Sequence, residues 1–161
     1  MLRLHSNLLW EKVREAGRDE PESKDSLRQR ERLFSILRGV RLPEDELAPH
    51  AACVVDYLRT FGQARTLSPV FCLDALIMMS HMPAAVIEKH IDSVMFWVIA
   101  EPEEDGDFFV QPTALQVIAK LAPKTLASLN LKAQIAAAPL AESKLRSERE
   151  QVAKLLKSIP D

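Results

Sequence analysis

The sequence predicts an all-α fold, built as a right-handed stack of antiparallel helix pairs. Three prolines, Pro43, Pro83 and Pro123, are spaced by forty residues each time, and each introduces a helix-like apolar pattern. Only four glycines occur, and Val, Ile and aromatic residues form no alternating runs, so helix formers dominate the chain. A period of about 40 residues is typical of stacked two-helix units. About three such units fit the chain.

The forty-residue shift also superimposes the residues that follow each proline. The apolar sets that coincide are Ala51, Ile91 and Leu131; Val55, Met95 and Ile135; and Leu58, Val98 and Ala138. One polar position recurs as His50, His90 and Asn130. These three residues have two interpretations: polar side chains at the edge of the apolar stripe, or a ladder of hydrogen-bonding groups that binds an extended ligand.

Residues 1–24 are predicted to form an N-terminal docking helix followed by a charged linker. The helix is expected from Ser6 to Ala16, with Ser6 as its cap and Gly17 at its end. Its apolar stripe consists of Leu9, Trp10 and Val13. Acidic residues follow this stripe too closely for a good mitochondrial presequence, so docking is the preferred interpretation.

Residues 25–161 are predicted to form the helical-repeat domain, and its first unit pairs helices over 25–38 and 44–61. Gly39 and Gly62 are expected to end these helices, because glycine tolerates the left-handed conformation found there. Pro49 is expected to split the second segment into a short turn over 44–48 and a helix over 50–61. The inward side chains predicted for the first helix are Leu33, Ile36 and Leu37.

The later units follow the same plan. Helices are expected over 69–81, capped by Ser68 and Pro69, and over 84–99, the most apolar stretch of the chain. The third unit spans 112–121 and 124–137. A final helix over 140–158 would cap the stack with a charged outer face. Its predicted inner face consists of Leu145, Val152, Leu155, Leu156 and Ile159.

Over residues 25–140 the chain resembles HEAT or armadillo-type helical repeats, which pair two antiparallel helices per unit of about forty residues. This resemblance implies a scaffold that holds other macromolecules. A second, looser resemblance is to organellar RNA-associated helical repeats of similar period, and it implies RNA binding.

Charge is distributed unevenly along the chain. Residues 66–110 contain eight Asp or Glu and a single Lys89. Five of these acids form one cluster: Glu101, Glu103, Glu104, Asp105 and Asp107. We expect an exposed loop there, which either contacts a basic protein partner or serves only solvation. Phe108 and Phe109 follow directly and are expected to re-enter the core.

A second charged group lies in and after the first repeat helix. It comprises Arg28, Arg32, Arg38 and Arg41, of which Arg28 and Arg32 are one helical turn apart. The two interpretations are a solvated outer face and a contact for phosphate or an acidic protein.

The sequence contains no pattern that indicates catalysis or a metal site. HExxH, CxxC, phosphate-binding glycine motifs and GxSxG are all missing. Glu88, His90 and Asp92 are two residues apart on a helix, so they cannot converge on one ion. We therefore expect a protein that is not an enzyme, with no cofactor and no metal.

Cys53 and Cys72 lie in apolar helical runs and are expected to pack as small buried hydrophobes without a disulfide. This usage favours a reducing, intracellular compartment, and we expect the cytoplasm rather than the mitochondrion. No stretch approaches 18 uncharged apolar residues, so no membrane insertion is expected.

These observations predict a non-catalytic protein–protein interaction scaffold, or a small adaptor subunit of a larger assembly. The partners would be other protein chains with a basic surface. The alternative is an RNA-binding helical-repeat protein of an organelle. A continuous basic groove would favour RNA, and an acidic or mixed groove with exposed apolar residues would favour protein.

Overall fold

The computed structural model of the chain describes residues 2–19, 24–40, 42–63, 72–100 and 109–160. Every regular element within these ranges is a helix and none is a strand, which confirms the predicted all-α class. The elements are α1 (Leu2–Asp19), α2 (Lys24–Val40), α3 (Glu44–Leu47), the 3₁₀ turn η1 (Ala48–His50), α4 (Ala51–Gln63), α5 (Leu73–Ser80), α6 (Ala84–Lys89), α7 (Ile91–Ile99), α8 (Val110–Ile118), α9 (Pro123–Ser128), α10 (Leu131–Ala136), the 3₁₀ turn η3 (Pro139–Glu142) and α11 (Arg146–Ser158).

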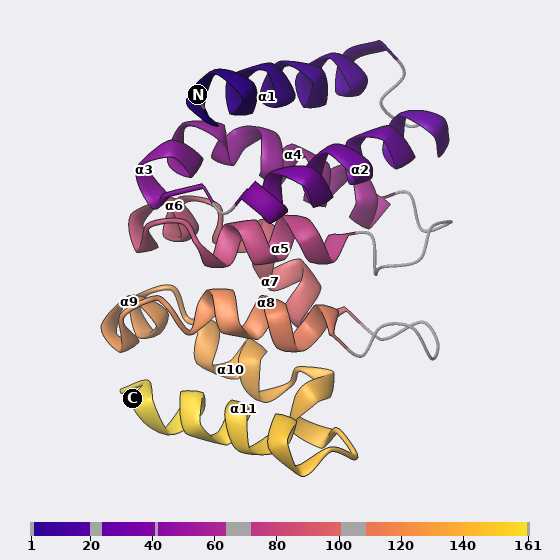
Figure 1. Ribbon diagram of the computed structural model, residues 1–161. Helices are drawn as coiled ribbons and strands as arrows, with labels where there is room; N and C mark the ends of the chain where they lie inside the picture. The colour runs from indigo at the N-terminus through magenta and orange to yellow at the C-terminus, as the bar shows by residue number, and fades with distance from the viewer. Residues whose placement is uncertain (1, 20–23, 41, 64–71, 101–108, 161) are drawn as a thin grey trace.

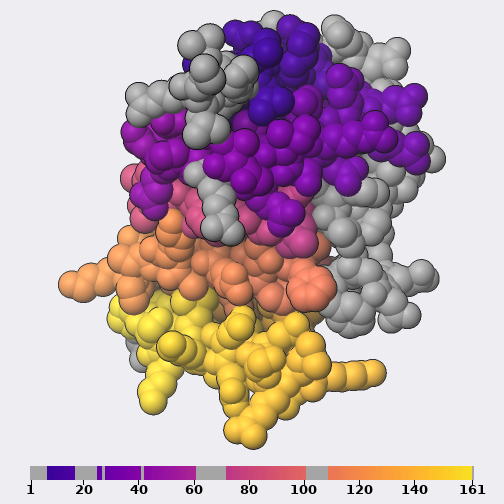
Figure 2. Space-filling model, viewed as in Figure 1, coloured from indigo at the N-terminus to yellow at the C-terminus, as the bar shows by residue number. Residues whose placement is uncertain are grey.

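The helices succeed one another along one axis of the molecule. α1 lies at one end of the stack and α11 at the other (Figure 1). In the space-filling view the colours form successive bands in the order of the sequence (Figure 2). Segments close in sequence are therefore neighbours in space, as a helical stack requires.

The helices of the three predicted units follow one another along the stack. The first helices of the units, α2, α5 and α8, contact one another in that order, and so do their second helices, α4, α7 and α10. α4 also packs on α5, α7 on α8, and α10 on α11, so each unit covers the next. This packing of helix pairs is compatible with a helical-repeat architecture. The right-handed sense stays a prediction.

The repeated prolines begin the second half of each unit. Pro43 and Pro83 directly precede α3 and α6 with extended backbones, at φ −60° and −57°. Pro123 occupies the first position of α9, so the third unit starts its helix one residue earlier. Proline suits these positions because the first turn of a helix leaves its N–H groups without intrahelical partners.

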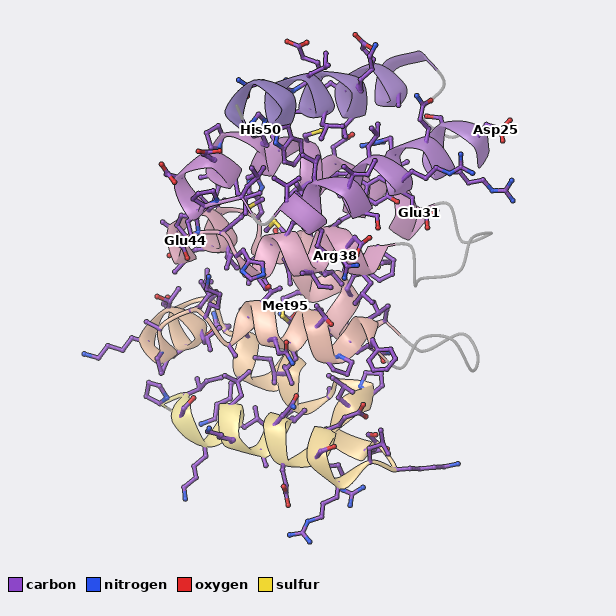
Figure 3. The ribbon with its side chains drawn as sticks, viewed as in Figure 1. Asp25, Glu31, Arg38, Glu44, His50 and Met95 are labelled. Atoms are coloured by element: carbon purple, nitrogen blue, oxygen red, sulfur yellow. The ribbon has the colours of Figure 1, made fainter. Side chains whose placement is uncertain are left out.

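The apolar positions that recur with the forty-residue period form the core. All nine superimposed residues, from Ala51 to Ala138, are buried, and they belong to one continuous cluster. Met95 lies in the middle of the stack (Figure 3). The register read from the sequence is therefore confirmed.

The predicted continuous helices over 84–99 and 124–137 are wrong, because each is broken at the recurring polar position. His90 separates α6 from α7, and Asn130 separates α9 from α10. In the first unit η1 occupies the same place, and the predicted split around Pro49 is confirmed. The segment that follows each repeated proline is therefore interrupted and does not form one continuous helix.

The predicted helix ends at Ser6, Gly17, Gly39 and Gly62 are also wrong, because all four residues lie inside helices. None of the glycines in the described ranges has a positive φ. Helix ends marked by glycine need that left-handed backbone, so these glycines do not act as terminators. The predicted cap at Ser68 and Pro69 lies outside the described ranges.

Three apolar side chains predicted to face inward are exposed. Ile36 and Leu145 are each 51% exposed, and Phe109 is 69% exposed. On α2 Leu37 is buried as predicted, and Phe34 is buried in place of Ile36. Of the predicted stripes, Trp10 and Val13 on α1 and Val152 and Ile159 near α11 are buried as expected.

Polar contacts tie the units together at the edges of this core. The Arg38 guanidinium lies 2.7 Å from the Asp74 carboxylate, joining α2 to α5. Lys120, just after α8, donates to the Met82 carbonyl at 2.9 Å. It also lies 3.5 Å from the Glu44 carboxylate in α3, so one side chain reaches all three units.

Candidate interaction surfaces

The acidic cluster Glu101, Glu103, Glu104, Asp105 and Asp107 lies outside the residues that the structure describes. Its two flanks are described. The buried Gln111 amide donates to the Ala100 carbonyl at 2.6 Å and ties the start of α8 to the end of α7. The acidic segment therefore connects two packed helices that are joined by this hydrogen bond.

Large apolar side chains are exposed on both flanks of that segment. Phe96 and Ile99, one turn apart on α7, are 44% and 45% exposed, and Phe109 caps the start of α8. We call these three residues the α7–α8 edge. Phe109 does not re-enter the core as predicted, because Val110 takes the first buried position of α8.

Sequence reasoning missed two members of the α7–α8 edge, although a signal was present. The stripe Ile91, Met95 and Val98 already accounts for one buried face of α7. Phe96 and Ile99 follow Met95 and Val98 by one residue each, which turns them about 100° away from that face. Apolar side chains beyond a filled stripe indicate a second contact surface.

The predicted basic group does not form an isolated positive patch. Arg28 and Arg32 are exposed on α2, whereas Arg38 is paired with Asp74, and Arg41 lies outside the described ranges. Acidic groups accompany these arginines, because Glu31 lies close enough to interact electrostatically with Arg32 and Arg28. Burial, followed by the nearby Asp74 carboxylate, raises the pKa of Glu31.

His50, His90 and Asn130 occupy equivalent junctions rather than the middle of helices. Asn130 adopts the left-handed conformation, at φ 54° and ψ 34°, which Asn tolerates better than most residues. His90 links α6 to α7, and burial followed by the charges of Lys89 and Arg59 lowers its pKa. A ligand-binding ladder formed by these residues stays a prediction.

His50 differs from the other two because another element covers it. Its imidazole stacks on the Trp10 indole of α1, with ring centroids 4.3 Å apart and planes 9° from parallel. The Arg14 guanidinium of α1 lies 2.8 Å from His50 Nδ1. In Figure 3 His50 lies on the side of the first unit that faces α1.

Two hollows mark the surface of the stack. A cavity of about 620 Å³ opens between α2, α3 and the end of α5. Its walls combine apolar Leu42, Leu47 and Met78 with the polar Arg38 and His81. A smaller cavity of about 320 Å³ lies between α8 and α11 and is lined by Leu115 and Leu155 among others.

Three further features concern metal binding, membrane spanning and the cysteines. Within the described ranges, no three His, Cys, Asp or Glu side chains group in a way that could hold a metal ion. None of the helices there is both long and apolar enough to cross a membrane. Cys72 is buried and Cys53 is half-buried, and neither forms a disulfide with another described residue.

The fold and these surfaces define an all-α stack of packed helix pairs with an apolar edge beside an acidic segment. Comparison of the chain with protein-family models, curated proteins and solved structures finds no match.

Proposed function

We propose that this protein is a non-catalytic protein-interaction module, a scaffold or small adaptor subunit that binds its partner through the α7–α8 edge. The observation that carries the proposal is the exposure of Phe96, Ile99 and Phe109 on two packed helices of the stack. Contiguous exposed apolar side chains beside polar ones mark protein interaction sites. Segments anchored on a rigid scaffold commonly provide recognition.

The chemistry of the edge indicates the kind of partner. The sequence between Ile99 and Phe109 contains five acids and no basic residue. A complementary partner presents apolar side chains to the α7–α8 edge and Lys or Arg around them. Such charge pairing mainly speeds encounter and sets orientation, while the apolar contacts supply affinity.

The alternative, RNA binding, finds less support in the described residues. RNA-binding surfaces usually combine a strong positive field with aromatic platforms. Here Arg38 is paired with Asp74, and Glu31 lies among the arginines of α2. The exposed aromatic residues Phe96 and Phe109 instead flank the acidic segment in the sequence.

The test is affinity purification from the native source with three forms of the chain. The first is the parent, and the second replaces Phe96, Ile99 and Phe109 with Ser. The third is a control, Ile36→Ser with Leu145→Ser, which removes two comparably exposed apolar side chains elsewhere.

A protein that co-purifies with the parent and the control, and is lost with the edge variant, supports the proposal. Equal recovery with all three forms contradicts it. Recovery of RNA that is lost on replacing Arg28 and Arg32 with Ser would instead favour the RNA-binding alternative.

A further inference from the structure

α1 packs on the first unit at one end of the stack (Figure 1). It contacts α2 and α4, and its Trp10, Val13 and Ala16 side chains are buried. The Trp10 indole meets Phe34 edge-on, with centroids 6.0 Å apart, and stacks flat on His50. α1 thus takes the place that a neighbouring unit occupies further along the stack.

One hydrogen bond at this interface depends on the protonation state of His50. Arg14 Nη2 lies 2.8 Å from His50 Nδ1, and a guanidinium can only donate. His50 Nδ1 must therefore be the acceptor, so the imidazole is neutral and carries its proton on Nε2. A second proton on His50 would remove this acceptor. It would also place the positively charged imidazolium in contact with the positively charged Arg14 guanidinium.

We propose that the Arg14–His50 hydrogen bond is a pH-sensitive latch, which holds α1 on the first unit when His50 is neutral and releases it when His50 is protonated. Release would expose Phe34 and the flat face of His50 that Trp10 now covers. The exposed surface could accommodate another helix, because in the closed state it accommodates α1.

The elements around His50 also carry charged or titratable groups. α1 contributes Arg14, α2 contributes Arg30, and α4 contributes Asp56 and the Cys53 thiol. Asp56 accepts from Arg30 at 2.9 Å, so its charge is already engaged. The acids of α3, which precede His50 by four to six residues, are Glu44, Asp45 and Glu46.

Arg14 dominates among these groups because it lies within hydrogen-bonding distance of the ring. Burial, followed by the Arg14 charge, lowers the pKa of His50. Attraction of a protonated imidazole to the Trp10 face opposes this effect, but a like charge in direct contact outweighs it.

The interface also contains polar groups that favour opening. Trp10 Nε1 is buried without a hydrogen-bond partner within the described ranges, and so are Arg30 Nε and Nη1. A buried donor without an acceptor costs free energy that contact with water recovers. Any of these donors that water reaches when α1 lifts lowers the cost of release.

The direction of the pH response follows from the depressed pKa. The closed state binds the His50 proton more weakly than the open state does. The latch is therefore intact above the ordinary histidine pKa of about 6.5 and weakens as the pH falls through and below that value.

Hydrogen exchange measured by mass spectrometry on the full chain tests this proposal at pH 7.5 and 5.5, after correction for intrinsic exchange. We expect protection of α1 to fall at least about fivefold relative to α8 at the lower pH, the lower end of typical coupling between sites. His50→Gln retains an acceptor for Arg14 but does not titrate, so its α1 protection should be independent of pH. His90→Gln is the matched control and should keep the parent response.

A second variant guards against the possibility that His50→Gln disturbs the stack. Arg14→Met removes both the donor and the like charge but leaves His50 partly buried, so it should reduce the pH response of α1 without abolishing it. Unchanged α1 protection at pH 5.5, an equal fall in α1 and α8, or a response that is undiminished in both variants would overturn the latch.

Discussion

Met95 tests whether a residue at a recurring core position contributes strongly to the stability of the fold. It is buried in the central helix α7, at the position equivalent to Val55 and Ile135 (Figure 3). Met95→Asp places an unpaired charge in the core and should cost roughly 3–5 kcal/mol of unfolding free energy. Urea unfolding measures this loss. Phe96→Asp, at the next, exposed residue, should cost much less, and equal costs would contradict the register.

Glu31 predicts a pH effect of the same origin as that of His50, burial of a titratable group, but of opposite direction. Burial and the nearby Asp74 hold its pKa above the unfolded value. Its ionised form is therefore disfavoured in the folded state, and its contribution to stability falls as the pH rises through the carboxyl range. Glu31→Gln should stabilise the protein slightly at pH 7 and have less effect at pH 3. Paired urea melts check this, and a stabilisation that grows at low pH would refute it.

At the scale of elements, Gly39 is a helical residue without a structural need for glycine. It lies in the last turn of α2, and a Cβ added there would meet no atom within 4 Å. Gly39→Ala should therefore raise stability by about 0.5–1 kcal/mol through the lower backbone entropy of the unfolded chain. Thermal unfolding measures the gain. Gln29→Ala, on the exposed face of the same helix, should change stability much less, and a loss at Gly39 would contradict the structure.

Unlike Gly39, Asn130 occupies a junction that requires a left-handed backbone conformation. Its φ of 54° is strained for most side chains, and the residue is exposed, so conformation rather than packing decides the outcome. Asn130→Val should destabilise by about 1–2 kcal/mol, whereas Asn130→Gly should be nearly neutral. Chemical denaturation of both variants distinguishes them. Equal stability of the Val and Gly variants would show that the left-handed junction is not needed.

At the scale of the whole molecule, the acidic segment beside the α7–α8 edge predicts salt-dependent binding. Replacing Glu103, Glu104, Asp105 and Asp107 together with Ser should slow association with the co-purified partner at low salt. The difference from the parent should shrink at moderate salt, because screening weakens charge steering. Stopped-flow kinetics at both salt concentrations measure this. An unchanged rate and salt dependence would leave the segment with a role in solvation only.

The sequence by itself determined the all-α class, the forty-residue register and the recurring apolar residues of the core. These follow from local chemistry: helix formers dominate, prolines start helices, and apolar residues repeat with the helical period. Ala51, Ile91 and Leu131 are buried because the repeat places each on the same inward face. The acidic cluster and the arginines of α2 could be found in the same way, as patterns of composition.

Tertiary structure decided which of these residues meet, because contact depends on helices that are far apart in sequence. Nothing local indicates that Arg14 reaches His50, or that Arg38 pairs with Asp74. Exposure of Ile36 and Phe109 likewise depends on which neighbours cover each helix face. Periodicity identifies an apolar face, but only the packing of the whole stack determines whether that face is covered or left open for a partner.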